Sequence, residues 1–164
     1  GVRFGRYHIF LFKLFKPSAV SLRTLLWKNY HEKNEQLEPP TFGLNFLEQD
    51  KPSNREFMLL CGFEKFDRFY VRIDILERLF LMIFNSKNKN NDTEIKLIPD
   101  MLNLLGCNKE NFIKLLNKMN YKTFEKEKDL YFKYLPSKKV FKKKNVKKGI
   151  EDNPFQVLKQ LNLD

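Results

Sequence analysis

The secondary structure predicted for residues 74–135 constrains the fold of this 164-residue chain more than any other feature of its sequence. Apolar residues recur at helical spacing over residues 74–86, and Asp74 with Glu77 three positions later matches a capping box, so an amphipathic helix is predicted to begin at Asp74. Residues 87–92 contain no apolar side chain, and we therefore expect a loop after this helix.

A short strand and two further helices are predicted next. Residues 95–98 alternate weakly between apolar and polar side chains, as a short strand does. Pro99 stands where the first position of a helix favours proline, and Gly106 is expected as the left-handed cap that ends this helix. Asn108 is a favourable N-cap for the third helix, whose apolar face continues until Asn120. The second and third helices are thus joined by a tight turn.

Two strands complete the pattern. Residues 121–126 and 130–135 are predicted to pair, with Lys128 and Asp129 at the tip of their hairpin. The resulting order is helix, strand, helix, helix, strand, strand, which is that of a winged helix-turn-helix, with the final hairpin as its wing. The sequence therefore predicts an α+β fold, mainly helical, with a winged helix-turn-helix-like unit in the C-terminal half.

The N-terminal part is predicted to be a small hairpin followed by a helix, together spanning residues 1–38. Residues 2–12 are predicted to form a hairpin or a strand bulged at Gly5, and Pro17 then begins a helix. We expect Trp27 on this helix to lie in the core. Beside it runs an apolar stripe that consists of Leu22, Leu25, Leu26 and Tyr30.

Residues 53–135 are predicted to form the domain that contains the winged-helix-like unit, with its core at 74–135. Ser53 and Glu56 match a second capping box ahead of a short helix. Alternating side chains over residues 69–73 then predict a strand that leads directly into the first helix of the unit.

The segments on either side of this domain have compositions that disfavour packed structure. Pro39 and Pro40 remove two backbone donors and fix an extended path, which predicts a linker or long loop over residues 39–52. Residues 136–164 begin with a lysine-rich run that is too charged to fold alone, and we expect a basic flexible tail. The tail is predicted to end in a short amphipathic helix whose apolar face consists of Phe155, Leu158 and Leu161.

Charge indicates a polyanionic partner. The chain carries 31 Lys and Arg against 20 Asp and Glu, a net charge of +11. The third helix of a helix-turn-helix enters the major groove of DNA, and its outer side here offers lysine for phosphate and asparagine for adenine edges. No arginine follows Arg78, so we expect contact with the backbone and not sequence readout. The predicted nucleic-acid-binding residues, on this helix, the wing and the tail, are Lys109, Asn111, Lys114, Asn117, Lys118, Lys126, Lys128, Lys138, Lys139, Lys142, Lys143 and Lys144.

The sequence contains no catalytic or metal-binding motif. It has no glycine-rich phosphate-binding loop, and its two cysteines, Cys61 and Cys107, have no second ligand at zinc spacing. His8 and His31 have no nucleophile or paired acid beside them at motif spacing. No apolar run is long enough to span a bilayer. We therefore expect a cytoplasmic chain with no cofactor or metal of its own and no membrane partner.

Several short motifs occur in a definite order along the chain. The motifs are GVRFGRYHIFL at residues 1–11, LFKP at 14–17, LRTLLW at 22–27, CGF at 61–63, VRIDILER at 71–78, MLNLLGC at 101–107 and NPF at 153–155. With them, most of the chain outside its loops resembles the C-terminal region of alphaproteobacterial superfamily-two helicases, which are relatives of the mitochondrial degradosome RNA helicase. The chain departs from that group in composition, because Lys, Asn and Phe replace an Ala-, Arg- and Pro-rich character.

The resemblance implies a non-catalytic accessory segment of an ATP-dependent helicase, whose motor domains lie upstream and bind ATP and Mg²⁺. A first residue of Gly1 instead of Met agrees with a fragment or processed product. The implied partners are nucleic acid, with RNA favoured over DNA, the motor domains of the same parent chain, and a protein that docks on Phe155, Leu158 and Leu161. An alternative remains open: a structural or protein-interaction module that packs on the motor core or recruits a partner such as a nuclease, with its positive charge incidental.

Overall fold

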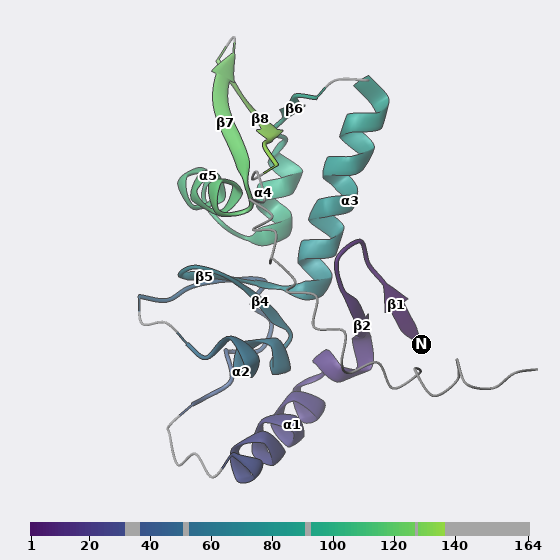
Figure 1. Ribbon diagram of the computed structural model, residues 1–164, viewed down its shortest axis with the longest axis vertical. Coiled ribbons are helices and arrows are strands. Elements are labelled where there is room, and N and C mark those ends of the chain that lie inside the picture. The colour runs from purple at the N-terminus through teal and green to yellow at the C-terminus, as the bar shows by residue number, and fades with distance from the viewer. Residues whose placement is uncertain (32–36, 51–52, 91–92, 127, 137–164) are drawn as a thin grey trace, which may run out of the picture.

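The computed structural model describes five stretches of the chain, whose helices and strands are labelled in Figure 1. These stretches are residues 1–31, 37–50, 53–90, 93–126 and 128–136. Their fold is α+β, with helices and small antiparallel sheets. The predicted tail and its terminal helix lie outside the described residues, as do the candidate residues Lys138, Lys139, Lys142, Lys143, Lys144, Phe155, Leu158 and Leu161.

The N-terminal hairpin and the start of the following helix are confirmed. Strand β1 (Val2–Phe4) pairs antiparallel with β2 (Ile9–Leu11). A 3-10 helix, η1 (Phe12–Phe15), leads into α1 (Pro17–Tyr30), whose first residue is the predicted proline. Proline suits this place because the first amides of a helix have no acceptor within it.

Helix α1 buries a different face from the one that its leucines suggest. Val20 and Thr24 are buried, and Trp27 packs on the Phe57 ring at a centroid distance of 5.4 Å. The apolar stripe lies on the other side of the helix and is exposed to solvent: Leu22 58%, Leu25 56%, Leu26 58% and Tyr30 84%. The stripe alone could not indicate which side of α1 packs, because the neighbour that decides this, α2, lies far along the chain.

A three-stranded sheet and one helix form the middle of the chain. Helix α2 (Arg55–Leu60) precedes β4 (Phe63–Phe66) and β5 (Phe69–Arg72), and the two strands pair antiparallel. Strand β3 (Phe46–Glu48) pairs with the other edge of β5, so the sheet order is β3-β5-β4. The predicted linker over residues 39–52 therefore contributes a strand to this sheet.

The capping box predicted at the start of α2 is wrong by one residue. The N-cap is Asn54, whose side chain accepts hydrogen bonds from the amides of Glu56 at 2.9 Å and Phe57 at 3.4 Å. Ser53 instead donates its amide to the Tyr70 hydroxyl at 2.9 Å. Serine and asparagine are both good caps, so their order in the sequence could not decide between them.

The C-terminal unit contains all the predicted elements in the predicted order. A three-stranded antiparallel sheet with the order β6-β8-β7 lies beside three helices (Figure 1). The first strand of the unit therefore pairs with the last. The elements are α3 (Ile73–Asn90), β6 (Ile95–Lys96), α4 (Pro99–Leu105), α5 (Lys109–Lys118), β7 (Tyr121–Lys126) and β8 (Asp129–Tyr134).

Local signals set the ends of α4 and α5 as predicted. Pro99 is the first residue of α4, and Gly106 caps its end in the left-handed region with φ +70°. The Asn108 side chain accepts a hydrogen bond from the Asn111 amide at 2.8 Å and so caps the start of α5. Asn120 has φ +65° in the turn into β7, a conformation that asparagine tolerates better than most residues.

Two boundaries differ from the prediction. Helix α3 continues to Asn90, so residues 87–90 are helical and not part of a loop. The lysine and asparagine side chains of this segment add no apolar surface to a core, which favoured a loop. Neither residue type ends a helix as proline or glycine would. At the β7–β8 hairpin, Asp129 pairs with Lys126 as the first residue of β8. The tip therefore includes Lys128, which has φ +71°, but not Asp129.

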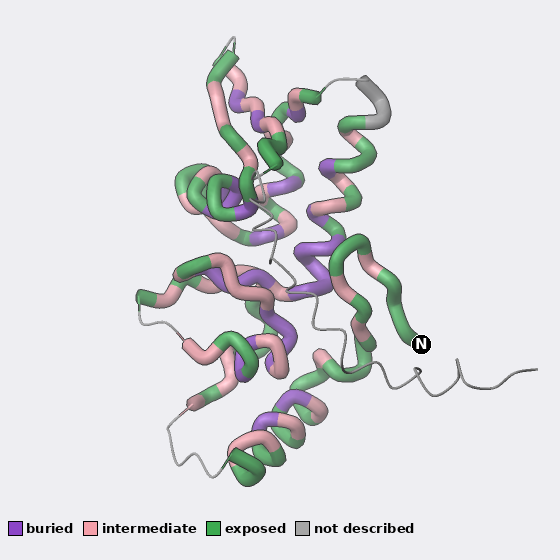
Figure 2. Tube along the Cα trace, in the orientation of Figure 1, coloured by how far each residue is buried: buried purple, intermediate pink, exposed green. Residues whose placement is uncertain are grey.

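One strand joins the two hydrophobic cores of the described chain. Phe69 and Val71 of β5 belong to the larger core, which is built mainly by α3, α4, α5 and β8. Tyr70, between them in the sequence, points to the other face and belongs to the smaller core with Phe57 and Met58 of α2. Figure 2 shows buried residues along β5 and continuing into the first turns of α3. The middle sheet thus packs on both sides and links the N-terminal elements to the C-terminal unit.

The predicted capping box at the start of α3 is also wrong. Asp74 is buried and accepts two hydrogen bonds from the Arg72 guanidinium, at 2.6 and 3.0 Å. Glu77 is only 5% exposed, and its carboxylate binds the turn of the N-terminal hairpin. It accepts hydrogen bonds from the backbone amides of Arg6 at 2.5 Å, Tyr7 at 3.0 Å and His8 at 2.9 Å. The ring Nδ1 of His8 lies 2.8 Å from Oε1 of the same carboxylate. We call this arrangement the Glu77 clasp.

Glu77→Gln is expected to destabilise the protein, because the amide NH₂ of glutamine would face hydrogen-bond donors in the clasp. Leaving a buried donor without an acceptor costs about 1–3 kcal/mol, and urea unfolding followed by circular dichroism measures this loss. Glu125→Gln is the matched control, since Glu125 is exposed on β7, and it is expected to change stability by less than about 0.5 kcal/mol. Equal unfolding midpoints for both variants would show that the clasp does not stabilise the fold.

Candidate nucleic-acid interface

The predicted contact residues of α5 do not form one free surface. The helix packs through Phe112, Leu115 and Leu116, which are fully buried. Lys109, Lys114, Asn117 and Lys118 are exposed, and Asn111 is partly exposed. The structure therefore places the predicted polar side of α5 outside the core, as periodicity indicated.

Two of the predicted residues are bound by the middle sheet. The Asn111 side chain donates to the Glu48 carboxylate of β3 at 2.9 Å. Lys118 lies 2.6 Å from the Asp67 carboxylate in the β4–β5 turn, and this hydrogen bond and charge lower the pKa of Asp67. Positions 111 and 118 are seven residues apart and lie on the same side of a helix. This side of α5 therefore borders the middle sheet through two surface contacts, and Lys118 remains 51% exposed.

The remaining predicted residues are in two separate places. Lys109, Lys114 and Asn117 have no carboxylate partner among the described residues. On the hairpin, Lys126 lies 3.8 Å from Glu94, whereas Lys128 is exposed and unpaired in the described part of the chain. Figure 1 shows the hairpin tip well away from α5, so the helix and the tip contribute to different parts of the surface.

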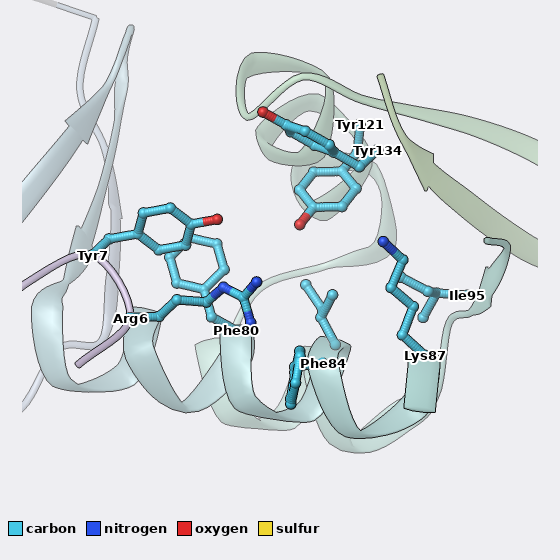
Figure 3. Close-up of a pocket in the computed structure, with 9 residues that line it drawn as sticks. Arg6, Tyr7, Phe80, Phe84, Lys87, Ile95, Tyr121 and Tyr134 are labelled. Atoms are coloured by element: carbon cyan, nitrogen blue, oxygen red, sulfur yellow. The ribbon is translucent and has the colours of Figure 1, made fainter. Parts of the chain in front are cut away.

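A pocket of about 140 Å³ lies where the turn of the N-terminal hairpin meets α3 and the β6-β8-β7 sheet (Figure 3). Its walls are mainly aromatic, and two cations stand at its opposite ends in Figure 3. The Arg6 guanidinium lies 4.8 Å from the centre of the Phe84 ring. The residues that line the pocket are Arg6, Tyr7, Phe80, Ile83, Phe84, Lys87, Ile95, Tyr121 and Tyr134.

The chemistry of this pocket favours binding over catalysis. The ring centroids of Tyr7 and Phe80 are 4.6 Å apart, and those of Tyr121 and Tyr134 are 5.2 Å apart. Burial raises the pKa of Tyr121 to about 12, so its hydroxyl keeps its proton at neutral pH. Rings flanked by Arg6 and Lys87 suit a flat anionic group. The pocket contains no nucleophile paired with a base.

The two cysteines of the described chain are not activated thiols. Burial raises the pKa of Cys61 and of Cys107 to about 11 each, so both thiols are protonated and inert at neutral pH. Among the described residues, no group of His, Cys, Asp and Glu side chains is placed to hold a metal ion. Within the same residues, no helix has both the length and the apolar character needed to cross a bilayer.

Comparison with known proteins identifies no relative. No protein-family model matches the chain, and neither a characterised protein nor a solved structure is similar to it at a significant level. Function must therefore be inferred from the chain's own residues and geometry.

The sequence did not predict the pocket or the lysines on the solvent face of the β6-β8-β7 sheet. Arg6 and Lys87 are 81 positions apart in the sequence, and no local signal connects them. Lys122 and Lys133 lie in strands that were predicted, but only the observed register places them opposite each other. Period-two alternation in β7 and β8 indicated the face of each lysine without indicating its partner.

Both cysteines are expected to react slowly with a thiol reagent such as dithiobis-nitrobenzoate at neutral pH in the folded protein. Unfolding in urea returns their pKa to roughly 8.5, and this change alone should raise the reaction rate about 10²-fold. The absorbance of released thionitrobenzoate measures both rates, and the unfolded chain is the internal control. Rapid labelling of both thiols in the folded protein would contradict the burial described above.

Proposed function

We propose that this chain is a non-catalytic accessory module that binds nucleic acid through its phosphate backbone. The single observation that carries the proposal is a set of exposed lysines on the C-terminal unit that have no carboxylate partner among the described residues: Lys109, Lys114 and Lys128. Unpaired cations on a chain of net charge +11 favour a polyanion.

We further propose that residues 73–135 are a winged-helix unit. The order of elements from α3 to β8 and the sheet order β6-β8-β7 support this assignment. Helix α5 would be the recognition helix, but Asn111 and Lys118 are bound by the middle sheet along one side of it. Because these two side chains are engaged within the chain, and because no arginine follows Arg78, we propose backbone contact without sequence readout.

The wider context that we propose is an ATP-dependent helicase. The resemblance of the sequence motifs supports this context, with ATP and Mg²⁺ bound by motor domains in the same parent chain and the module holding the strand that leaves the motor. In that setting RNA is the favoured ligand, and the parent protein is cytoplasmic.

A second candidate function is a module that packs on another protein, such as the motor core. The exposed stripe of α1 favours it, because large exposed apolar patches mark protein contacts. The N-terminal hairpin adds Phe4, which is 81% exposed, and Ile9, which is 70% exposed. This surface is separate from the lysines of the C-terminal unit, and the two functions are compatible in one helicase segment.

Salt dependence tests the first function. The chain is expected to bind a fluorescent single-stranded RNA at low salt, with log affinity falling against log salt by about 0.7 per phosphate contact. Lys109→Glu/Lys114→Glu should weaken binding by about tenfold or more and make this slope shallower. Fluorescence anisotropy measures both quantities, and a duplex DNA of equal length is the comparison ligand.

The matched control is Lys13→Glu/Lys16→Glu, which makes the same change in net charge on the exposed surface between the hairpin and α1. We expect it to leave most of the affinity intact, because those lysines lie on a different surface. Lys118→Glu is unsuitable, since it would also break the ion pair with Asp67. Absence of RNA and DNA binding by the unaltered chain at low salt would refute the proposed function.

A further inference from the structure

The β6-β8-β7 sheet has one face in the core and one face in solvent. On the inner face, Leu130 and Phe132 of β8 are buried. Their neighbours in the sequence point the other way, because alternate residues of a strand project to opposite faces. The register pairs Lys122 with Lys133 and Phe124 with Tyr131 on this outer face. Strand β6 adds Lys96, which lies opposite Tyr131 on the same face.

Two aromatic rings lie side by side at the centre of this face. Phe124 and Tyr131 are nearly parallel, with an interplanar angle of 17° and a centroid distance of 6.1 Å. Neither ring belongs to the two hydrophobic cores or packs against them, and both are partly exposed. A pair of partly exposed aromatic side chains that supports no core is available to a ligand.

The lysines around these rings are only partly neutralised. Lys96 is paired with Asp129, a contact that raises the pKa of the lysine, and Lys126 lies 3.8 Å from Glu94. Lys122 and Lys133 have no carboxylate partner among the described residues, and they face each other directly across the strand pair.

Like charges directly opposite each other destabilise an antiparallel strand pair. A bound anion removes this repulsion, because it neutralises both ammonium groups at once. The Lys122–Lys133 pair therefore gives the free hairpin an unfavourable contact that an anionic ligand relieves.

We propose that the outer face of the β6-β8-β7 sheet binds single-stranded nucleic acid. Phe124 and Tyr131 stack on bases, and Lys122 and Lys133, which lie together at one end of this ring pair, bind the adjacent phosphates. Aromatic rings interleaved with cations are the combination that single strands use, because their bases expose flat faces that a duplex keeps stacked inside. The inference rests on the proposed function and adds to it the strandedness of the ligand and the surface that holds it.

The structure favours a nucleic acid over an acidic peptide for this face. An acidic peptide would neutralise Lys122 and Lys133 but would have no flat group for the parallel rings. The two ligands therefore differ in whether binding needs an aromatic ring at position 131, and this difference can be measured.

The aromatic test uses Tyr131→Leu, with Tyr131→Phe as the matched control. Leucine keeps apolar bulk on the strand but has no ring, so single-stranded RNA is expected to bind about tenfold more weakly. Phenylalanine keeps the ring and should bind as the unaltered chain does. Anisotropy titrations with a single-stranded and a duplex oligonucleotide measure the affinities, and the single strand should bind more tightly. Equal binding by Tyr131→Leu and Tyr131→Phe would overturn base stacking on this face.

The charge test uses Lys122→Glu, which separates binding from folding because its two effects have opposite signs. Glutamate opposite Lys133 replaces repulsion by attraction, so the urea midpoint of unfolding should rise. The same change should weaken RNA binding by about tenfold, since it places a negative charge beside the phosphates. Lys13→Glu makes the same charge change away from the sheet and should alter neither quantity appreciably.

The outcomes distinguish this inference from the proposed function. If the unaltered chain binds RNA but Lys122→Glu and Tyr131→Leu bind equally well, the sheet face is not the site and the function itself stands through other lysines. If Lys122→Glu weakens binding and Tyr131→Leu does not, the face is a charged surface that takes any polyanion, and the single-strand proposal fails. If the unaltered chain binds no nucleic acid, both fail together.

Discussion

The Glu77 clasp is the interaction on which the position of the N-terminal hairpin and the pocket beside it depends. Burying a carboxylate is costly unless hydrogen bonds replace its water, and here three amides and an imidazole do so. The hairpin turn is thereby tied to α3 across about 70 positions of sequence, as the 71-residue separation of Arg6 and Glu77 shows. The clasp also needs Gly5, because a Cβ there would overlap the Glu77 side chain. The pocket depends on the same contact, which brings Arg6 and Tyr7 against Phe84 and Phe80.

The middle sheet plays a corresponding role for the C-terminal unit. Strand β5 shares its side chains between both cores, and the same sheet supplies Glu48 and Asp67 to α5. The third helix of the predicted winged helix is thus contacted along one side by its own chain. The cationic surfaces that remain open are therefore Lys109 and Lys114 of α5, the hairpin tip and the outer face of the β6-β8-β7 sheet.

Features with local causes could be predicted, and features with distant partners could not. Pro99, Gly106 and Asn108 act on the backbone within a few residues, so the ends of α4 and α5 followed from the sequence. Glu77 looked equally local, as half of a capping box, but its carboxylate binds a turn that begins the chain. The buried side of α1 could not be predicted for the same reason. Periodicity identifies an apolar side of a helix but not the element that packs against the helix.

The residues of the candidate site show the same difference between local and distant causes. Sequence reasoning identified lysines by helix face, and Lys109 and Lys114 remain available where it placed them. It put Asp129 at the hairpin tip and gave no register, whereas Asp129 pairs with Lys126 and Lys122 lies opposite Lys133. Lys122 and Lys133 therefore form a like-charged pair next to the nearly parallel rings of Phe124 and Tyr131. The anionic ligand proposed for this face would neutralise both ammonium groups and so remove their repulsion.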